Sequence, residues 1–257
     1  METVLFIIQT IGAISFALTG TIIAIQKKTD FVGAVFFALL TAFGGGIIRD
    51  LVLNHTPRVF MEAEMYITAA CCAGLALICF HLAFYKPIAR FIGAHKHNFL
   101  LELSDAMGLS TFCVVGVDVG RSVAGADATT VLLIFCGLIT GVGGGMLRDI
   151  CSAQIPSVFR KNIYLIPAVL GSTLYTLTYD HWNPLVSMLL SIALIIVIRF
   201  LAYFFKWNLP VHKENEQQNR FGIAKAVVFY LVFCRRTSNA STVAAEAAER
   251  EPRNSRP

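Results

Sequence analysis

The residues with the clearest chemical potential form one motif that occurs twice. Three consecutive glycines are followed, after two apolar residues, by an arginine and an aspartate, and the two arginines lie 99 residues apart. The copies consist of Gly44, Gly45, Gly46, Arg49 and Asp50, and of Gly143, Gly144, Gly145, Arg148 and Asp149. Each glycine weakens a helix by up to about 1 kcal/mol relative to alanine. Two matched triplets are therefore not accidental.

The glycine triplets predict that two helices break or kink at equivalent positions. A broken helix frees backbone carbonyl oxygens, and inside a membrane such backbone is tolerated only beside protein or water. Carbonyl oxygens can replace part of the hydration shell of a permeant cation. Close packing is the alternative, because small residues let two helices approach each other. The sequence leaves both interpretations open.

Four hydroxyl side chains recur with the same symmetry. Thr41 and Thr140 precede the two triplets at the same distance, whereas Ser15 and Thr111 are matched by a shift of 96 residues. All four are candidate pore-lining or ion-binding groups. Each hydroxyl could instead bond to the backbone of its own helix, and both roles stay open.

The two Arg-Asp pairs are predicted to lie at the mouths of a pathway or to serve as structural charges. Adjacent helical residues point about 100° apart, so we expect Arg49 and Arg148 to bond acceptors on neighbouring spans or to flank the mouths. Asp105 is a further candidate for attracting or binding cations. Glu102 and Asp118 are expected to be solvated at the ends of their spans.

The elements that must position these residues are membrane spans. The chain has 257 residues, of which 56% are hydrophobic and 14% charged, with a mean hydropathy of +0.67. A water-soluble domain carries about a quarter charged residues. The apolar runs predict an all-α polytopic membrane protein with seven spans. These lie near residues 3–25, 31–53, 65–85, 101–118, 128–150, 162–179 and 184–205.

The repeated motif divides the chain into two three-span units and a seventh span. A unit with three crossings reverses direction when it is repeated, which predicts inverted repeats. The predicted parts are a first repeat (1–85), a cytoplasmic linker (86–100), a second repeat (101–180), the seventh span (181–205) and a cytoplasmic juxtamembrane segment with a disordered tail (206–257).

The charges predict an orientation rather than a nucleic-acid partner. Lysine and arginine concentrate in the segments on one side of the seven spans, and that side is cytoplasmic by the positive-inside rule. The amino terminus is therefore expected outside and the carboxyl terminus inside. The net charge of +5 then reflects topology, so we expect a lipid bilayer as partner and no nucleic acid.

An intramembrane enzyme is the third function class, and the sequence argues against it. The six histidines lie mostly in linkers, and the chain has neither an HExxH motif nor a nucleophile beside a base. The seven cysteines lack the paired spacing of a metal site. We expect no catalytic residues, no metal and no cofactor.

The paired glycine-arginine-aspartate motifs resemble the prokaryotic members of the trimeric intracellular cation (TRIC) channel family, over about residues 5 to 205. The resemblance implies a homotrimer in a bacterial inner membrane, with a pore for potassium and sodium in each protomer. It also implies that kinked second and fifth spans line the constriction. The same sequence class is labelled a glycine transporter domain, so a secondary transporter of glycine or another small amino acid is the alternative.

Overall fold

The computed structural model describes residues 2–83, 98–160 and 164–205, and its regular elements in these ranges are all helical. The predicted tail (206–257) and most of the predicted linker (86–100) lie outside the described residues. The elements are α1 (Glu2–Gln26), α2 (Phe31–Val52), the 3-10 helix η1 (Arg58–Phe60), α3 (Ala63–Ala83), α5 (Asn98–Ala124), the 3-10 helix η3 (Gly125–Asp127), α6 (Thr130–Cys151), α7 (Ser157–Arg160), α8 (Leu165–Thr178) and α9 (Pro184–Phe204).

The predicted all-α membrane class is confirmed. Within the described part of the chain, six helices are long and apolar enough to cross a membrane: α1, α2, α3, α5, α6 and α9. The seventh predicted span contains α8, which is also apolar but has 14 residues. At a rise of about 1.5 Å per residue, α8 is about 21 Å long and shorter than a hydrocarbon core.

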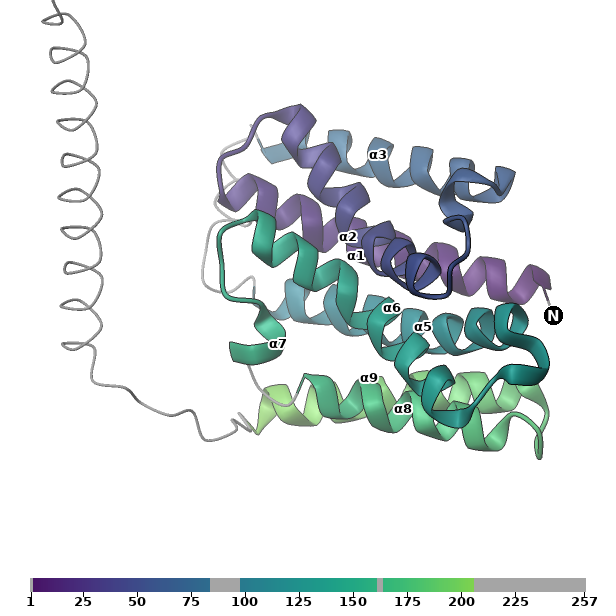
Figure 1. Ribbon diagram of the computed structural model, residues 1–257. Helices are drawn as coiled ribbons and strands as arrows, with labels where there is room; N and C mark the ends of the chain where they lie inside the picture. Colours follow the sequence, from purple (N-terminus) through teal and green to yellow (C-terminus); the bar gives the residue numbers. More distant parts are fainter. Residues whose placement is uncertain (1, 84–97, 161–163, 206–257) are drawn as a thin grey trace, which may run out of the picture. The chain divides into compact units, whose positions relative to one another are not determined.

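The two three-helix units run in opposite directions. Figure 1 shows that α1 begins at the end of the bundle where α5 finishes, and that α2 and α6 cross between the units. The local structure repeats as well. Asp30 caps the start of α2 and Thr129 caps the start of α6, while Asn54 and Ala153 have positive φ angles of 53° and 54° just after the two helices. These positions differ by 99 residues, as the glycine motifs do.

The centre of the bundle is a backbone-to-backbone contact between α2 and α6. A Cβ atom built on Gly45 would collide with the carbonyl oxygen of Thr140, and one on Gly144 would collide with the carbonyl oxygen of Thr41. A Cβ on Gly143 would lie 3.0 Å from the Cα of Gly45. The reciprocal contacts place the pseudo-two-fold axis at this crossing. Any side chain here would force the two helices apart.

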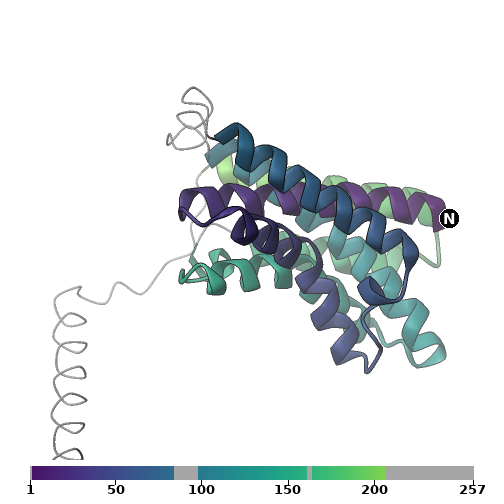
Figure 2. The ribbon, with the colours of Figure 1, turned by 90° about the horizontal axis from the view of Figure 1, so that it is seen from above.

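Neither central helix breaks at its triplet. Both α2 and α6 are helical throughout, so the unwound backbone that the glycines suggested is wrong. In Figure 2, the α2 ribbon changes direction part-way along its length. The hydroxyls of Thr41 and Thr140 donate to the carbonyls of Phe37 and Cys136, four residues earlier, each at 2.6 Å. Such back-bonding bends helices, and the glycines permit the close crossing.

We expect Gly45→Ala and Gly144→Ala to lower the free energy of unfolding by about 1–3 kcal/mol each, because overpacking at a tight contact strains both backbones. Unfolding of the purified protein in mixed detergent micelles measures the change. Gly74→Ala is the matched control, since a Cβ on Gly74 in α3 meets no atom within 4 Å, and a gain in helix propensity favours alanine there. Equal stability of all three variants would contradict this account of the crossing.

Candidate functional site

The first Arg-Asp pair lies at the end of α2, buried within the bundle. Arg49 donates from Nε to Asp50 Oδ1 at 2.8 Å, and its Nη2 lies 2.6 Å from the same oxygen. The other oxygen of Asp50 accepts the backbone N–H of Arg58 at 2.9 Å. The carboxylate therefore neutralises a buried guanidinium and also fixes the segment that follows α2. We call this region the Arg49 end.

The second pair repeats this geometry at the end of α6. Arg148 donates from Nε to Asp149 Oδ1 at 2.9 Å, and Asp149 Oδ2 accepts the backbone N–H of Ser157 at 2.7 Å. The expectation that adjacent residues would not pair is wrong at both ends. The arginine side chain is long enough to bend around the helix, and burial excludes the water that would compete for the carboxylate. We call this region the Arg148 end.

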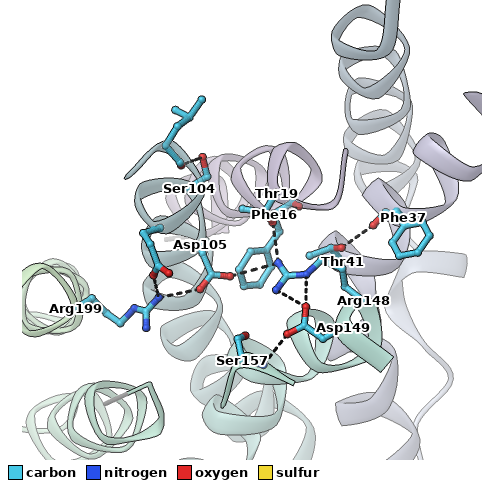
Figure 3. Close-up of polar contacts among 12 residues, drawn as sticks. Phe16, Thr19, Phe37, Thr41, Ser104, Asp105, Arg148, Asp149, Ser157 and Arg199 are labelled. Carbon is cyan, nitrogen blue, oxygen red and sulfur yellow. Dashed lines mark hydrogen bonds and ion pairs between the residues drawn. The ribbon is translucent and has the colours of Figure 1, made fainter. Parts of the chain in front are cut away.

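Arg148 also reaches neighbouring helices, as predicted. Its Nη1 lies 3.3 Å from Thr19 Oγ1 on α1 and 3.5 Å from Asp105 Oδ1 on α5. Figure 3 shows Arg199 of α9 approaching Asp105 from the side opposite Arg148. Asp105 thus lies between two guanidiniums. Glu102, with a side chain 17% exposed, bonds to Arg199 at 2.8 Å, so its predicted solvation is wrong.

The two ends differ although their motifs are the same. The repeat places Gln9 of α1 where Asp105 stands in α5, and Val115 where Thr19 stands. Among the described residues, Asp50 supplies the hydrogen bonds that Arg49 makes. The Arg148 end therefore has an additional acid and an additional hydroxyl, both of which contact its arginine.

Two neighbouring cavities lie at the Arg49 end. The smaller has a volume of about 30 Å³, which is room for a water molecule, and the Arg49-Asp50 pair, Gly46 and Thr140 are among its lining residues. The larger, which we call the vestibule, has a volume of about 570 Å³. Both cavities are lined in part by Gln9, Arg58, Met65, Val115 and Val119.

The vestibule has an acidic wall. Glu62, Glu64 and Asp118 line it together with a single arginine, Arg58. Asp118 accepts a hydrogen bond from the hydroxyl of Tyr175 at 3.3 Å. The carboxylates give the cavity an excess of negative charge, which raises the local concentration of cations over that of anions.

The predicted glycines have two different roles in the structure. The first two of each triplet pack in the α2–α6 crossing. The third lies beside the guanidinium of its own helix, since Cβ atoms on Gly46 and Gly145 would lie 3.7 Å from Nη2 of Arg49 and Arg148. That spacing is ordinary van der Waals contact, so a Cβ at the third glycine would fit beside the arginine.

The predicted hydroxyls bond to their own helices. Ser15 donates to the carbonyl of Ile11 at 2.9 Å, and Thr111 donates to the carbonyl of Met107 at 2.9 Å. Thr41 and Thr140 have the same arrangement, but Thr140 also lines the smaller cavity. The structure brings Gly46, Thr140 and the Arg49-Asp50 pair to one cavity.

Sequence reasoning missed Arg199 and the vestibule. Arg199 stands alone in the apolar run of the last span, and an isolated charge within a span is a signal of a buried partner. The vestibule had no such signal. Arg58 and Glu62 lie in and just after η1, between two spans, where charged residues are ordinary.

Comparison with known proteins identifies the family. One family model, described as a glycine transporter, matches residues 6–82 and again residues 102–180. A relative in Deinococcus radiodurans, described as a UPF0126 membrane protein, is 30% identical over 211 residues, which are 81% of this chain and 92% of the relative. A solved TRIC cation channel is 33% identical with a TM-score of 0.68, and the match covers 81% of this chain and 97% of that one.

The chain belongs to the prokaryotic TRIC family. A second solved TRIC protein, the trimeric intracellular cation channel orthologue from Rhodobacter sphaeroides, is 28% identical with a TM-score of 0.70, over 79% of this chain and 99% of that one. The recognition of a TRIC protein from the paired motifs is therefore confirmed. The relatives also confirm that this TRIC protein is a membrane protein and not an enzyme.

Removal of Asp149 by Asp149→Ala is expected to reduce the free energy of unfolding of this TRIC protein by about 3–5 kcal/mol, because it leaves Arg148 with a reduced set of buried acceptors. Asp180→Ala is the control. Asp180 pairs with Arg121 at 3.0 Å, but its side chain is 64% exposed, so its loss changes the stability by less than about 1 kcal/mol. Similar effects of the two substitutions, measured by detergent-induced unfolding, would show that the Asp149 pair is not structural.

Proposed function

We propose that this TRIC protein is a channel for monovalent cations, potassium and sodium, with a pore in each protomer of a homotrimer. The observation that carries the proposal is the pair of cavities that leads to the Arg49-Asp50 pair at the end of α2, close to the crossing of two inverted repeats. The solved relatives are described as cation channels, and one as trimeric. Pseudo-symmetric crossings of this kind form pathways in many transport proteins.

The proposed pathway enters through the vestibule, passes Gly46 and Thr140, and runs beside the α2–α6 crossing, where the two backbones are in contact. It continues along the equivalent residues of the second repeat, from Gly145 to the Arg148-Asp149 pair. Three vestibule carboxylates against one arginine favour cations at the entrance. At the other end, the route reaches the ion pair of Asp105 with Arg148, whose charged groups lie 3.5 Å apart. Thr41, Ser15 and Thr111 support the bend and packing of the helices around this route.

The orientation of the pathway follows from the distribution of basic residues. Lys27 and Lys28 follow α1 and lie at the Arg148 end of the bundle, where α5 also begins. The positive-inside rule places this end in the cytoplasm. The vestibule would then face outward from a bacterial inner membrane. The labels of the relatives as membrane and inner membrane proteins support the location.

Transport of glycine or another small amino acid by alternating access is the second candidate. The family description favours it, since the model that matches both repeats is described as a glycine transporter. An arginine beside an aspartate at a small cavity also offers partners for the carboxylate and the ammonium group of a zwitterion. Carriers and channels share inverted repeats, so the distinction requires a transport measurement.

We expect the purified protein in a planar bilayer to give unitary currents that reverse at the potassium equilibrium potential under a potassium gradient. A carrier moves its substrate in a conformational cycle of microseconds to seconds and gives saturable uptake without resolvable unitary currents. Uptake of labelled glycine into proteoliposomes is therefore measured with the same preparation. Saturable glycine uptake without unitary current would reject the channel.

The charge of the vestibule predicts a dependence on ionic strength. Glu62→Gln and Asp118→Asn are expected to reduce unitary potassium conductance about twofold at 10 mM salt and to have little effect at 1 M, because the Debye length falls from about 30 Å to about 3 Å. Asp180→Asn is the control, since Asp180 is exposed but does not line the vestibule. A reduction that is the same at both salt concentrations would mean that these carboxylates do not attract the ions.

A further inference from the structure

Arg199 is the one arginine of α9, and the repeat does not account for it. The two repeats supply α1 to α3 and α5 to α8, whereas α9 is the additional helix and has no counterpart in the first repeat. It packs against α5 and α8. Arg199 is 6% exposed. A charged side chain buried inside a membrane bundle marks a function or a specific partner.

Arg199 is held by carboxylates and by an aromatic ring. Its Nη2 lies 2.8 Å from Glu102 Oε2 and 3.0 Å from Asp105 Oδ2, and its guanidinium carbon lies 4.2 Å from the ring centroid of Tyr164. The other oxygen of Asp105 lies 3.5 Å from Arg148. Arg199 therefore sits where two carboxylates and the negative face of an aromatic ring converge, which is an environment that binds cations.

The same cluster contains buried polar atoms without hydrogen-bond partners. Among the described residues, these include Arg199 Nε, Asp105 Oδ1 and the Tyr164 hydroxyl. A buried polar atom without a hydrogen bond is costly and needs an explanation. The Tyr164 hydroxyl and the Asp105 oxygen that Arg148 approaches to 3.5 Å therefore have hydrogen-bonding capacity that the guanidinium of Arg199 does not satisfy, and its own Nε is also unmatched. The carboxylates and the tyrosine thus offer more coordination than Arg199 uses.

The equivalent place at the Arg49 end lacks the acid and the tyrosine of this cluster. There the repeat has Gln9 in place of Asp105 and Met65 in place of Tyr164. Both Gln9 and Met65 line the two cavities of that end. The end without the acid, the tyrosine and the extra arginine is thus the end with a vestibule.

We propose that Arg199 is a tethered cation that occupies a cation site formed by Glu102 and Asp105 and thereby keeps the Arg148 end closed. This rests on the proposed channel function. The guanidinium takes the place that a permeating potassium ion would take beside the two carboxylates. Because Arg199 belongs to α9, movement of α9 away from α5 withdraws the blocking charge and frees both carboxylates. In this proposal, α9 is the helix whose movement opens or closes the pathway.

The test uses Arg199→Ala in planar bilayers, with free guanidinium ion as the probe. We expect the open probability to rise on the order of tenfold relative to the unmodified protein. A change of this size is ordinary for the coupling between two sites in a protein. Millimolar guanidinium added to the variant should restore the low open probability. Arg121→Ala is the matched control, because Arg121 also pairs with a carboxylate and lies 4.1 Å from a tyrosine ring, but its side chain is 25% exposed and that of its partner Asp180 is 64% exposed.

An unchanged open probability in Arg199→Ala, or an increase that guanidinium does not reverse, would overturn the proposal. The double variant Arg199→Gln with Glu102→Gln preserves the charge balance and covers the case in which the single variant does not fold. It should be open and insensitive to guanidinium, because Asp105 retains Arg148 as its partner. A double variant as closed as the unmodified protein would also overturn the proposal.

Thermal unfolding separates this proposal from the proposed function. Guanidinium chloride at millimolar concentration should raise the unfolding temperature of Arg199→Ala and leave that of Arg121→Ala and the unmodified protein unchanged, because a ligand stabilises the state that binds it. This readout needs no current. If the unmodified protein conducts no cations but guanidinium stabilises Arg199→Ala, the channel fails and the cation site stands. If the protein conducts and guanidinium has no effect, the tethered cation fails and the channel stands.

Discussion

The contact of α2 with α6 at Gly45 and Gly144 is the constraint on which the rest of the structure depends. In each direction, a Cβ atom on the glycine would collide with the carbonyl oxygen of a threonine on the other helix. The hydrophobic effect does not drive helices together in lipid, so close packing and weak backbone contacts contribute most of the attraction. A crossing as close as this one fixes the relative position of the two repeats, and with it the place of both Arg-Asp pairs.

The Arg-Asp pairs satisfy polar groups at the ends of α2 and α6. The chain that follows a helix ending inside or near a membrane has backbone N–H groups that need acceptors. Asp50 and Asp149 each bind the backbone of that segment with one oxygen and an arginine with the other. One carboxylate thus fixes the chain reversal and neutralises a buried charge. The motif places the aspartate next to the arginine because both tasks meet at the helix end.

The sequence was sufficient for the architecture because the architecture follows from periodic and repeated features. Apolar length predicts spans, and an odd number of spans per repeat predicts inversion. The sequence did not predict the path of the backbone at the glycine triplets. Glycine permits both unwinding and close approach, and only the neighbouring helix decides between them. At Gly45 the neighbour is a carbonyl of α6, so the helix stays intact and the small residue serves the contact.

The site was harder to predict than the fold because it depends on side chains from separate parts of the chain. The pairing of Arg49 with its neighbour Asp50 depends on how a flexible side chain bends in a dry environment, which helical geometry alone does not give. Arg199 carried a signal as a single charge in an apolar run, but its partners come from α5, almost 100 residues earlier in the chain. Its significance appears only when the two ends are superimposed through the repeat.

Symmetry in the backbone and asymmetry in the side chains have separate physical consequences. Inverted repeats produce two ends of the same shape, so a pathway through the centre would have equal barriers on both sides if the side chains also repeated. Exchange of Gln9 for Asp105 and of Met65 for Tyr164, together with the addition of Arg199, makes one end hold charged groups and leaves the other with a cavity. A pathway with one open and one closed end needs only one moving part. The helix that lies outside the repeat is the natural candidate, because it can move without disturbing the glycine crossing.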